Sequence, residues 1–331
     1  MRIWLLLALA LGSAPVAAQR AALDTAQRAA VDAFDLQGHR GARGLLPENT
    51  LPAFERALAL GVTTLELDIA ITSDGVAVIS HNPLLNPDIT RDSAGRFLER
   101  HGPAIHSLTW AQLQAYDVGR IKPGTEYARQ FPEQQPMDGT RVPRLADLFD
   151  LVKRSGDEKV RFDIETKLDP DKPGETPLPE AFARAVVDEI RKAGLAARAQ
   201  IQSFDWRTLQ VVQKIAPEIA TAYLSVQRRF DNIGAGKAEG SRWTAGFQFR
   251  DHGSVAKMIK AAGGGLWSCY YDDLDALKVR EAQALGLKVL AWTVNDAAAM
   301  ARMIELGVDG LITDRPDVAR RVLEERKLSW R

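Results

Sequence analysis

The sequence predicts an α/β fold, a (β/α)₈ TIM barrel with a long insertion after its second strand and hairpin. Apolar strand-like segments alternate with helical segments through most of the chain, and eight such strands form the main series. Alternation of this kind in one chain is typical of a closed barrel of parallel strands. An open doubly wound sheet is the alternative, but no Gly-x-Gly-x-x-Gly fingerprint opens a strand-to-helix turn.

Charge and composition narrow the classes of protein that this chain can belong to. The 331 residues include 43 basic and 43 acidic side chains, so the formal net charge is zero. No block of like charge appears, which gives no support for nucleic-acid binding. The apolar content is adequate for two small domains or one barrel, and the order of elements favours a single catalytic barrel domain over residues 19–331.

The first 18 residues are typical of a cleavable secretory signal. Arg2 supplies the positive end, and residues 3–11 form an apolar run too short to cross a bilayer. Val16 and Ala18 fit the small residues wanted before a cut, and no cysteine follows to carry a lipid anchor. We therefore expect a periplasmic or secreted protein without stable membrane insertion. A buried N-terminal helix is the alternative, but the segment has no polar face.

A glycine-rich turn follows the first predicted strand. The strand over residues 36–39 runs into a Gly-His-Arg-Gly sequence that contains His39 and Arg40, and a helix is predicted over residues 49–60. Glycines let the backbone turn sharply and approach a ligand closely. The turn therefore presents an acid/base group and a permanent cation at the end of the strand.

The second strand places two carboxylates on one face. Side chains alternate along a strand, so Glu66 and Asp68 share one face while Leu65 and Leu67 share the other. The apolar face can pack under helices. Two like charges at the end of an apolar strand are costly unless a cation lies between them. We therefore expect a hard divalent ion beside the preceding imidazole.

The chain then folds back in a short hairpin. A Ser-Asp-Gly turn at residues 73–75 leads into an apolar strand over residues 76–80. So short a turn forces antiparallel pairing. His81 follows directly, and the hairpin returns it to the neighbourhood of Asp68.

Residues 82–141 break the regular pattern with Pro, Gly and charged residues, and only residues 108–113 look helical. A segment of this length cannot thread a close-packed barrel interior, so we expect it to cap the active-site mouth. We expect an irregular segment with few buried contacts of its own. Leu108, Trp110 and Leu113 supply apolar surface with which one short helix can dock.

Regular alternation resumes after the insertion. A helix is predicted over residues 145–153 and a strand over residues 160–165. Further strands, separated by helical segments, are predicted over residues 199–203, 219–224, 265–270, 288–294 and 309–313. The lone cysteine, Cys269, lies in one of these apolar runs and is expected to be a buried, inert thiol.

Polar residues suited to chemistry gather at the ends of the predicted strands, where barrel enzymes place their active sites. Any one of them alone is explained by a salt bridge or by core packing, but their coincidence at one rim favours a functional site. The set consists of His39, Arg40, Glu66, Asp68, Asp163, Glu165, Lys167, Gln202, Ser203, Trp292 and Asn295.

Together these motifs resemble the glycerophosphodiester phosphodiesterase family, and its exported bacterial members in particular. The resemblance runs from about Asp35 to the end of the barrel and keeps the order and approximate spacing of the motifs. They are His39-Arg40-Gly41, Pro47-Glu48-Asn49-Thr50, Glu66-x-Asp68, His81, Glu165-x-Lys167, Gln202-Ser203-Phe204, Trp292-Thr293-Val294-Asn295 and Gly310-Leu311-Ile312-Thr313-Asp314-Arg315-Pro316. The sequence departs from the family at Asn82, where aspartate is usual, at Thr166, where an aliphatic residue is common, and in its long insertion.

The resemblance implies metal-dependent hydrolysis of small glycerophosphodiesters, such as glycerophosphocholine or glycerophosphoethanolamine, to glycerol 3-phosphate and an alcohol. It implies that Glu66, Asp68 and Glu165 hold one divalent cation. Carboxylate ligation favours Ca²⁺ or Mg²⁺ over zinc, which prefers His and Cys. No obligate protein partner is evident.

The resemblance also assigns roles to the residues around the cation. His39 and His81 would act as general acid and base, with the order of the two left open. Arg40 and Lys167 would donate hydrogen bonds to the phosphate. Trp292 would form a wall beside glycerol, and Gln202 would make a polar contact with it. The nucleophile is either water or a neighbouring hydroxyl of the substrate.

Two other functions share these features. Phosphatidylinositol-specific phospholipase C and sphingomyelinase D-like lyases use paired histidines at the same rim and stop at a cyclic phosphate. The sequence lacks the basic amphipathic stretch that docking on membranes favours. A glycerophosphate-binding protein without turnover is the other alternative, but it would not need both histidines.

Overall fold

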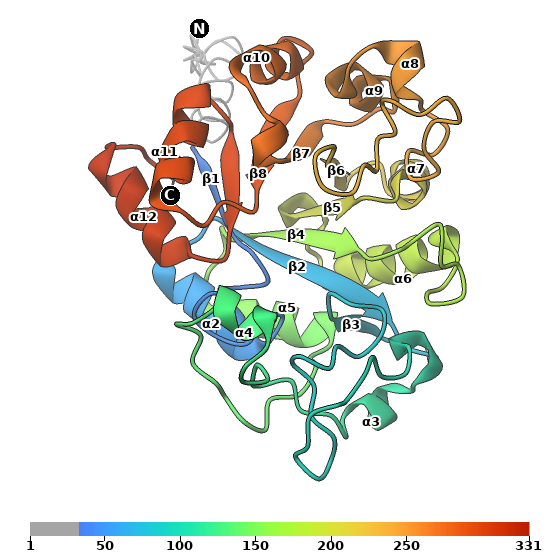
Figure 1. Cartoon of the computed structure of the whole chain (residues 1–331), viewed down its shortest axis with the longest axis vertical. Coiled ribbons are helices and arrows are strands. Elements are labelled where there is room, and N and C mark those ends of the chain that lie inside the picture. Colours follow the sequence, from blue (N-terminus) through green and yellow to red (C-terminus); the bar gives the residue numbers. More distant parts are fainter. Residues whose placement is uncertain (1–32, 331) are drawn as a thin grey trace, which may run out of the picture.

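Eight parallel strands form a closed barrel in the computed structural model, which describes residues 33–330 (Figure 1). They pair in the order β1-β9-β8-β7-β6-β5-β4-β2, and the additional pairing of β1 with β2 closes the barrel. The predicted (β/α)₈ TIM barrel is therefore confirmed, whereas the predicted signal peptide lies outside the described residues. The barrel strands are β1 (Asp35–Gly38), β2 (Thr64–Ile71), β4 (Arg161–Thr166), β5 (Ala199–Ser203), β6 (Ala220–Ser225), β7 (Leu266–Tyr270), β8 (Lys288–Trp292) and β9 (Gly310–Thr313).

Helices surround this barrel (Figure 1). They are α2 (Leu51–Leu60), α5 (Leu145–Ser155), α6 (Pro179–Lys192), α7 (Trp206–Ile215), α8 (Phe249–His252), α9 (Val255–Ala261), α10 (Ala276–Ala284), α11 (Ala297–Leu306) and α12 (Pro316–Glu325). Two 3₁₀ turns, η2 (Ala196–Arg198) and η3 (Tyr271–Asp273), connect them to strands. Across residues 33–330, none of the helices combines the length and apolar character needed to cross a bilayer.

Local signals at both ends define the first helix, α2. The Thr50 side chain accepts a hydrogen bond from the Ala53 N–H, which satisfies one of the free donors of the first turn. Gly61 ends the helix with φ +79°, a left-handed conformation that glycine adopts without strain. The helix therefore begins at Leu51, two residues after the predicted start, because Thr50 itself is the extended cap.

The alternation predicted for β2 decides which side chains enter the barrel. Leu65 and Leu67 are fully buried in the apolar core, together with residues of the surrounding helices. Glu66 and Asp68 are also buried, on the opposite face of the strand. The pairing of β2 with β4 places Asp68 beside Glu165. The strand register therefore brings together acidic residues that lie almost 100 positions apart in the sequence.

The hairpin after β2 is antiparallel, as its short turn predicts. Strand β3 (Ala77–Ile79) pairs with β2 through Ile69 opposite Ile79. The Ser80 N–H donates to the Asp68 carbonyl over 2.9 Å. This bond holds the next residue, His81, near Asp68 in β2.

The insertion gathers beside the β2–β3 hairpin (Figure 1) and contains η1 (Ile105–Ser107), α3 (Trp110–Leu113) and α4 (Glu126–Gln130). The docking of one short helix is confirmed, because Leu113 on α3 is fully buried. The expectation of few buried contacts is wrong. A second buried cluster joins the insertion to the hairpin, and its members are Ala70, Val78, Leu85, Ile105, Leu113, Val118 and Val142. This cluster could not be predicted from the sequence, because its apolar residues are separated by turns and polar positions.

The turn after β1 tolerates only glycine at Gly41, and this can be measured. Both Gly41 and Gly75 have φ near +80°, but a Cβ on Gly41 would lie 2.7 Å from the Ala53 carbonyl carbon, whereas one on Gly75 meets nothing within 4 Å. Gly75→Ala should therefore cost about 1 kcal/mol of the free energy of unfolding, and Gly41→Ala about 2–4 kcal/mol. Urea unfolding measures both. Equal losses would show that the turn does not pack as described.

Candidate active site

A cavity of about 470 Å³ opens at the carboxyl ends of the strands. This volume lies within the range of small-molecule sites. Of the nine residues given roles as metal, catalytic or substrate contacts, Asp68 alone is not part of the lining. The other eight line the cavity: His39, Arg40, Glu66, His81, Glu165, Lys167, Gln202 and Trp292. Asp163, Ser203 and Asn295, which also belong to the strand-end set, do not line the cavity.

Three carboxylates at this end of the barrel form a cluster that could hold a metal ion. Glu66, Asp68 and Glu165 are all buried, and each offers an oxygen within 4.8 Å of the others. Asp68 Oδ1 has no hydrogen-bond partner in the described part of the chain, although it is buried. An orphaned anionic oxygen among oxygen donors fits a hard divalent cation such as Ca²⁺ or Mg²⁺.

The shifted pKa values of Glu66 and Glu165 indicate that nearby positive charge does not fully balance the carboxylates of this cluster. Burial, followed by the charge of Asp68, raises the pKa of Glu66 well above its ordinary value. Burial likewise raises the pKa of Glu165 to about 7, while Lys167 opposes the shift. Burial acts to raise the pKa of Asp68 as well, but His81 and Arg40 outweigh it and lower that pKa. A bound cation would offset the repulsion that keeps two of these three groups poorly ionised.

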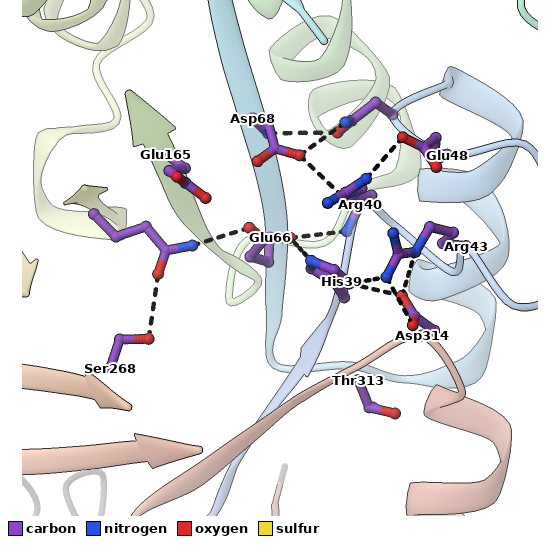
Figure 2. Close-up of polar contacts among 12 residues, drawn as sticks. His39, Arg40, Arg43, Glu48, Glu66, Asp68, Glu165, Ser268, Thr313 and Asp314 are labelled. Carbon is purple, nitrogen blue, oxygen red and sulfur yellow. Dashed lines mark hydrogen bonds and ion pairs between the residues drawn. The ribbon is translucent and has the colours of Figure 1, made fainter. Parts of the chain in front are cut away.

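Neutral donors fix the orientation of Glu66 (Figure 2). Gln202 Nε2 donates to Glu66 Oε1 over 2.9 Å, and the Arg40 backbone N–H donates to Oε2 over 2.8 Å. The Ser268 hydroxyl in turn donates to Gln202 Oε1 over 3.4 Å. The Gln202 amide group thus orients a carboxylate of the cluster, and because Gln202 also lines the cavity, its contact with glycerol stays a prediction.

The other two carboxylates are held from both sides. Asn49 Nδ2 donates to Asp68 Oδ2 over 2.9 Å, and Lys167 Nζ donates to Glu165 Oε1 over 2.7 Å. Lys167 Nζ also lies 3.7 Å from Asp68 Oδ1. Lys167, which was predicted to bind phosphate, therefore lies between two carboxylates of the carboxylate cluster.

His39 is oriented by a residue whose role the sequence analysis missed. Its Nδ1 lies 2.6 Å from Asp314 Oδ1, and its Nε2 lies 3.9 Å from Glu66 Oε2 (Figure 2). Burial, opposed by Asp314 and aided by Arg43, lowers the pKa of His39 to about 4. Asp314 directly follows β9, so the strand-end rule applied to the other site residues would have found it.

His81 reaches the same cavity from the β2–β3 hairpin. Its Nδ1 lies 3.3 Å from Asn82 Oδ1, so the asparagine supplies the acceptor oxygen that an aspartate would supply. Burial, then Arg40 and Lys167, hold the pKa of His81 well below its ordinary value. The pKa values of both imidazoles therefore lie below the ordinary value of histidine.

Arg40 has a strained backbone, and its side chain lies close to two carboxylates. Its φ is +50°, a left-handed value that is uncommon for a residue with a side chain. Nη1 donates to Glu48 Oε1 over 2.8 Å, and Nε lies 3.2 Å from Asp68 Oδ2. Such a backbone persists where surrounding contacts over-determine it, which is typical of functional sites. Glu48 was part of a sequence motif, but its pairing with Arg40 was not predicted.

Aromatic side chains form one wall of the cavity. Trp292 and Phe204 meet edge to face with ring centroids 5.4 Å apart, and Phe230 lies 5.3 Å from Phe204. Trp292 Nε1 is buried without a hydrogen-bond partner in the described residues. The predicted wall residue is therefore present, while Phe204 and Phe230 extend the apolar surface beyond it.

A buried carboxylate cluster, two imidazoles and two cationic side chains meet at one barrel mouth, an arrangement that suits a phosphoric diester hydrolase. The model of the glycerophosphoryl diester phosphodiesterase family matches residues 39–318, so the chain belongs to that family. Its members hydrolyse glycerophosphodiesters.

Individual relatives agree with this assignment. A solved structure from Silicibacter pomeroyi DSS-3, named after the same family, is 36% identical and has a TM-score of 0.79, covering 91% of this chain and 96% of its own. The glycerophosphodiester phosphodiesterase of Caldanaerobacter subterraneus subsp. tengcongensis is 28% identical, covering 84% of this chain and 93% of its own length. A phosphodiesterase from Oleispira antarctica shares the fold, with 21% identity and a TM-score of 0.63 over 88% of this chain and 97% of its own. That structure contains the product sn-glycerol-3-phosphate.

A divalent cation should raise the melting temperature of chelator-treated protein, because it binds the folded carboxylate cluster and not the unfolded chain. At a concentration one hundred times its Kd, Ca²⁺ or Mg²⁺ should add about 2.7 kcal/mol to the free energy of unfolding. Asp68→Asn should abolish the shift, whereas Glu239→Gln on the exposed surface should keep it. If neither ion changes the melting temperature of the wild type, the carboxylate cluster does not bind a metal ion.

The lowered pKa of His39 should make stability depend on pH between 6.5 and 4. Above pH 6.5 the imidazole is neutral in both states, but below it the unfolded chain binds a proton that the folded chain binds only near pH 4. Stability from this residue therefore falls as pH falls. Compared with His39→Gln in metal-free buffer, the wild type should lose about 3 kcal/mol across this window. A difference that stays constant with pH would refute the shifted pKa.

Proposed function

We propose that this protein hydrolyses small, water-soluble glycerophosphodiesters to glycerol 3-phosphate and an alcohol, with His39 and His81 as general acid and base. One observation carries the proposal: both imidazoles line the same cavity as the buried carboxylate cluster. The glycerol 3-phosphate in the related Oleispira antarctica structure supports the choice of product.

The residues of the cavity suggest how the reaction proceeds. Arg40 and Lys167 line it as cations and would donate to the phosphate oxygens. The bound phosphate would add negative charge beside both imidazoles and raise their pKa values toward the working pH. One imidazole would accept the proton of the nucleophile, and the other would protonate the leaving alcohol.

The carboxylate cluster would supply the remaining electrostatic stabilisation. When bound by Glu66, Asp68 and Glu165, a divalent cation polarises a phosphoryl oxygen and offsets developing negative charge. Trp292 would form the wall against which the carbon atoms of glycerol pack. The Asp314 carboxylate would hold His39 in a fixed orientation through the bond to Nδ1.

We also propose that the insertion narrows the site to small head groups. Pro83 and Gln130, one near each end of the insertion, line the cavity, and this placement supports a role in selecting the alcohol. The composition of residues 1–18 supports export and a mature chain that begins near Gln19.

Purified protein should release glycerol 3-phosphate from glycerophosphocholine in the presence of Ca²⁺ or Mg²⁺. His39→Ala and His81→Ala should each lower kcat by roughly 10²–10⁴, the range for a positioned acid or base. His101→Ala, which changes an exposed imidazole, should leave kcat unaltered. A persisting cyclic phosphate would indicate a lyase, intact bound diester would indicate a binding protein, and full activity of either active-site variant would refute the assigned roles.

Shortening Gln130 should widen the range of accepted alcohols. Gln130→Ala should increase kcat/KM for a diester with a bulkier alcohol relative to glycerophosphocholine, because the side chain borders the cavity. Gln135→Ala is the matched control, since this exposed glutamine lies on the same segment outside the cavity lining. An unchanged ratio of the two kcat/KM values would show that this part of the insertion does not select the substrate.

A further inference from the structure

We propose that Tyr127, on helix α4 of the insertion, is a positioning residue that joins Arg40 and His39 through one polar chain. This inference rests on the proposed function, because it concerns how two residues of that active site are held. It gives the insertion a second role, which is to complete the active site in addition to narrowing it.

The first half of the chain runs from Tyr127 to the carboxylate cluster. The Tyr127 hydroxyl donates to Glu48 Oε2, and Arg40 Nη1 donates to Glu48 Oε1 over 2.8 Å. Arg40 Nε then lies 3.2 Å from Asp68 Oδ2. Because the two oxygens of Glu48 are used by two different donors, the position of the tyrosine fixes the plane of the carboxylate that Arg40 faces.

The second half runs from the same hydroxyl to His39. Arg43 Nη1 donates to the Tyr127 oxygen over 3.2 Å. The Arg43 guanidinium also binds Asp314 through Nε at 2.7 Å and Nη2 at 2.9 Å, a two-point contact that fixes both groups (Figure 2). Asp314 holds His39 Nδ1 at 2.6 Å. The Tyr127 hydroxyl therefore donates to the carboxylate that binds Arg40. It accepts from the Arg43 guanidinium, which binds the carboxylate that holds His39.

The insertion packs around this phenol. Phe131 meets Tyr127 edge to face with centroids 5.0 Å apart, and the Arg43 guanidinium lies 4.5 Å from the centre of the Phe131 ring. Gln134 Nε2 donates to the Arg43 carbonyl over 2.7 Å. Several contacts of one insertion segment thus converge on the loop that follows β1.

Burial makes these bonds matter for geometry. Arg40 and Glu48 are less than a tenth exposed, and they belong to a loop that regular secondary structure does not hold. Buried charge-assisted bonds are strong, and a lost donor leaves its partner unsatisfied. Removal of the phenol oxygen would leave Glu48 Oε2 and Arg43 Nη1 each short of one partner.

A purely structural role would give a different result. If Tyr127 only anchored the insertion to the barrel, its removal would lower stability, and any loss of activity would be independent of Glu48. If Tyr127 acts through Glu48 on Arg40, the two changes are coupled. Coupling is measured by a double-mutant cycle.

The test compares Tyr127→Phe with Tyr116→Phe in the full-length, metal-loaded protein. Tyr116 belongs to the same insertion and packs against its second buried cluster, so it controls for loss of a tyrosine hydroxyl. With glycerophosphocholine, Tyr127→Phe should lower kcat about 10- to 100-fold with a smaller change in KM, while Tyr116→Phe stays within twofold of the wild type. In a Glu48→Gln background, Tyr127→Phe should reduce kcat by a smaller factor than in the wild type, because only the Arg43 side of the chain then remains to be lost.

Calorimetric titration with glycerol 3-phosphate provides a readout that needs no turnover. Tyr127→Phe should weaken binding several-fold, and Tyr116→Phe should not. Wild-type kinetics and affinity in a folded Tyr127→Phe variant, or losses that multiply with those of Glu48→Gln, would overturn the inference and leave the proposed function standing. A wild type that neither hydrolyses the diester nor binds glycerol 3-phosphate would overturn both.

Discussion

Mutual repulsion among Glu66, Asp68 and Glu165 is the constraint on which the rest of this structure depends. Strand β2 and its register with β4 force these carboxylates together inside the barrel, where their charge is poorly screened. The surrounding residues compensate with donors and positive charge, which Arg40 and Lys167 supply at short range. The cluster could hold a divalent cation, and the charge of that cation together with Arg40 and Lys167 would suit a phosphodiester anion.

Two groups of residues at the barrel rim compensate for this repulsion. Residues at strand ends contact the cavity directly, whereas Glu48, Asp314 and Tyr127 hold those residues in place. The second group comes from three distant parts of the chain. Ion pairs therefore connect these parts at the barrel rim, in addition to backbone hydrogen bonds. The insertion belongs to this arrangement, because it packs on the hairpin with one end and on the loop after β1 with the other.

The barrel and the pair of Glu66 and Asp68 were predictable from strand periodicity, whereas the family resemblance selected Glu165 as the third carboxylate of the cluster. Alternation placed Glu66 and Asp68 on one face, and the end of a later strand supplied Glu165. The pairing of His39 with Asp314, 275 positions apart, was not predicted, because the strand-end rule places both residues at the barrel rim but does not say which rim residues meet. Contacts of the insertion are harder still, because no period governs an irregular segment.

Anomalous diffraction from crystals soaked in Mn²⁺ tests the central claim most directly, because manganese replaces magnesium or calcium in oxygen-ligand sites and reveals its own position. The account predicts one strong peak bonded to oxygens of Glu66, Asp68 and Glu165, at the floor of the cavity that His39 and His81 line. A well-ordered site without such a peak, or a cation bound away from these carboxylates, would contradict it.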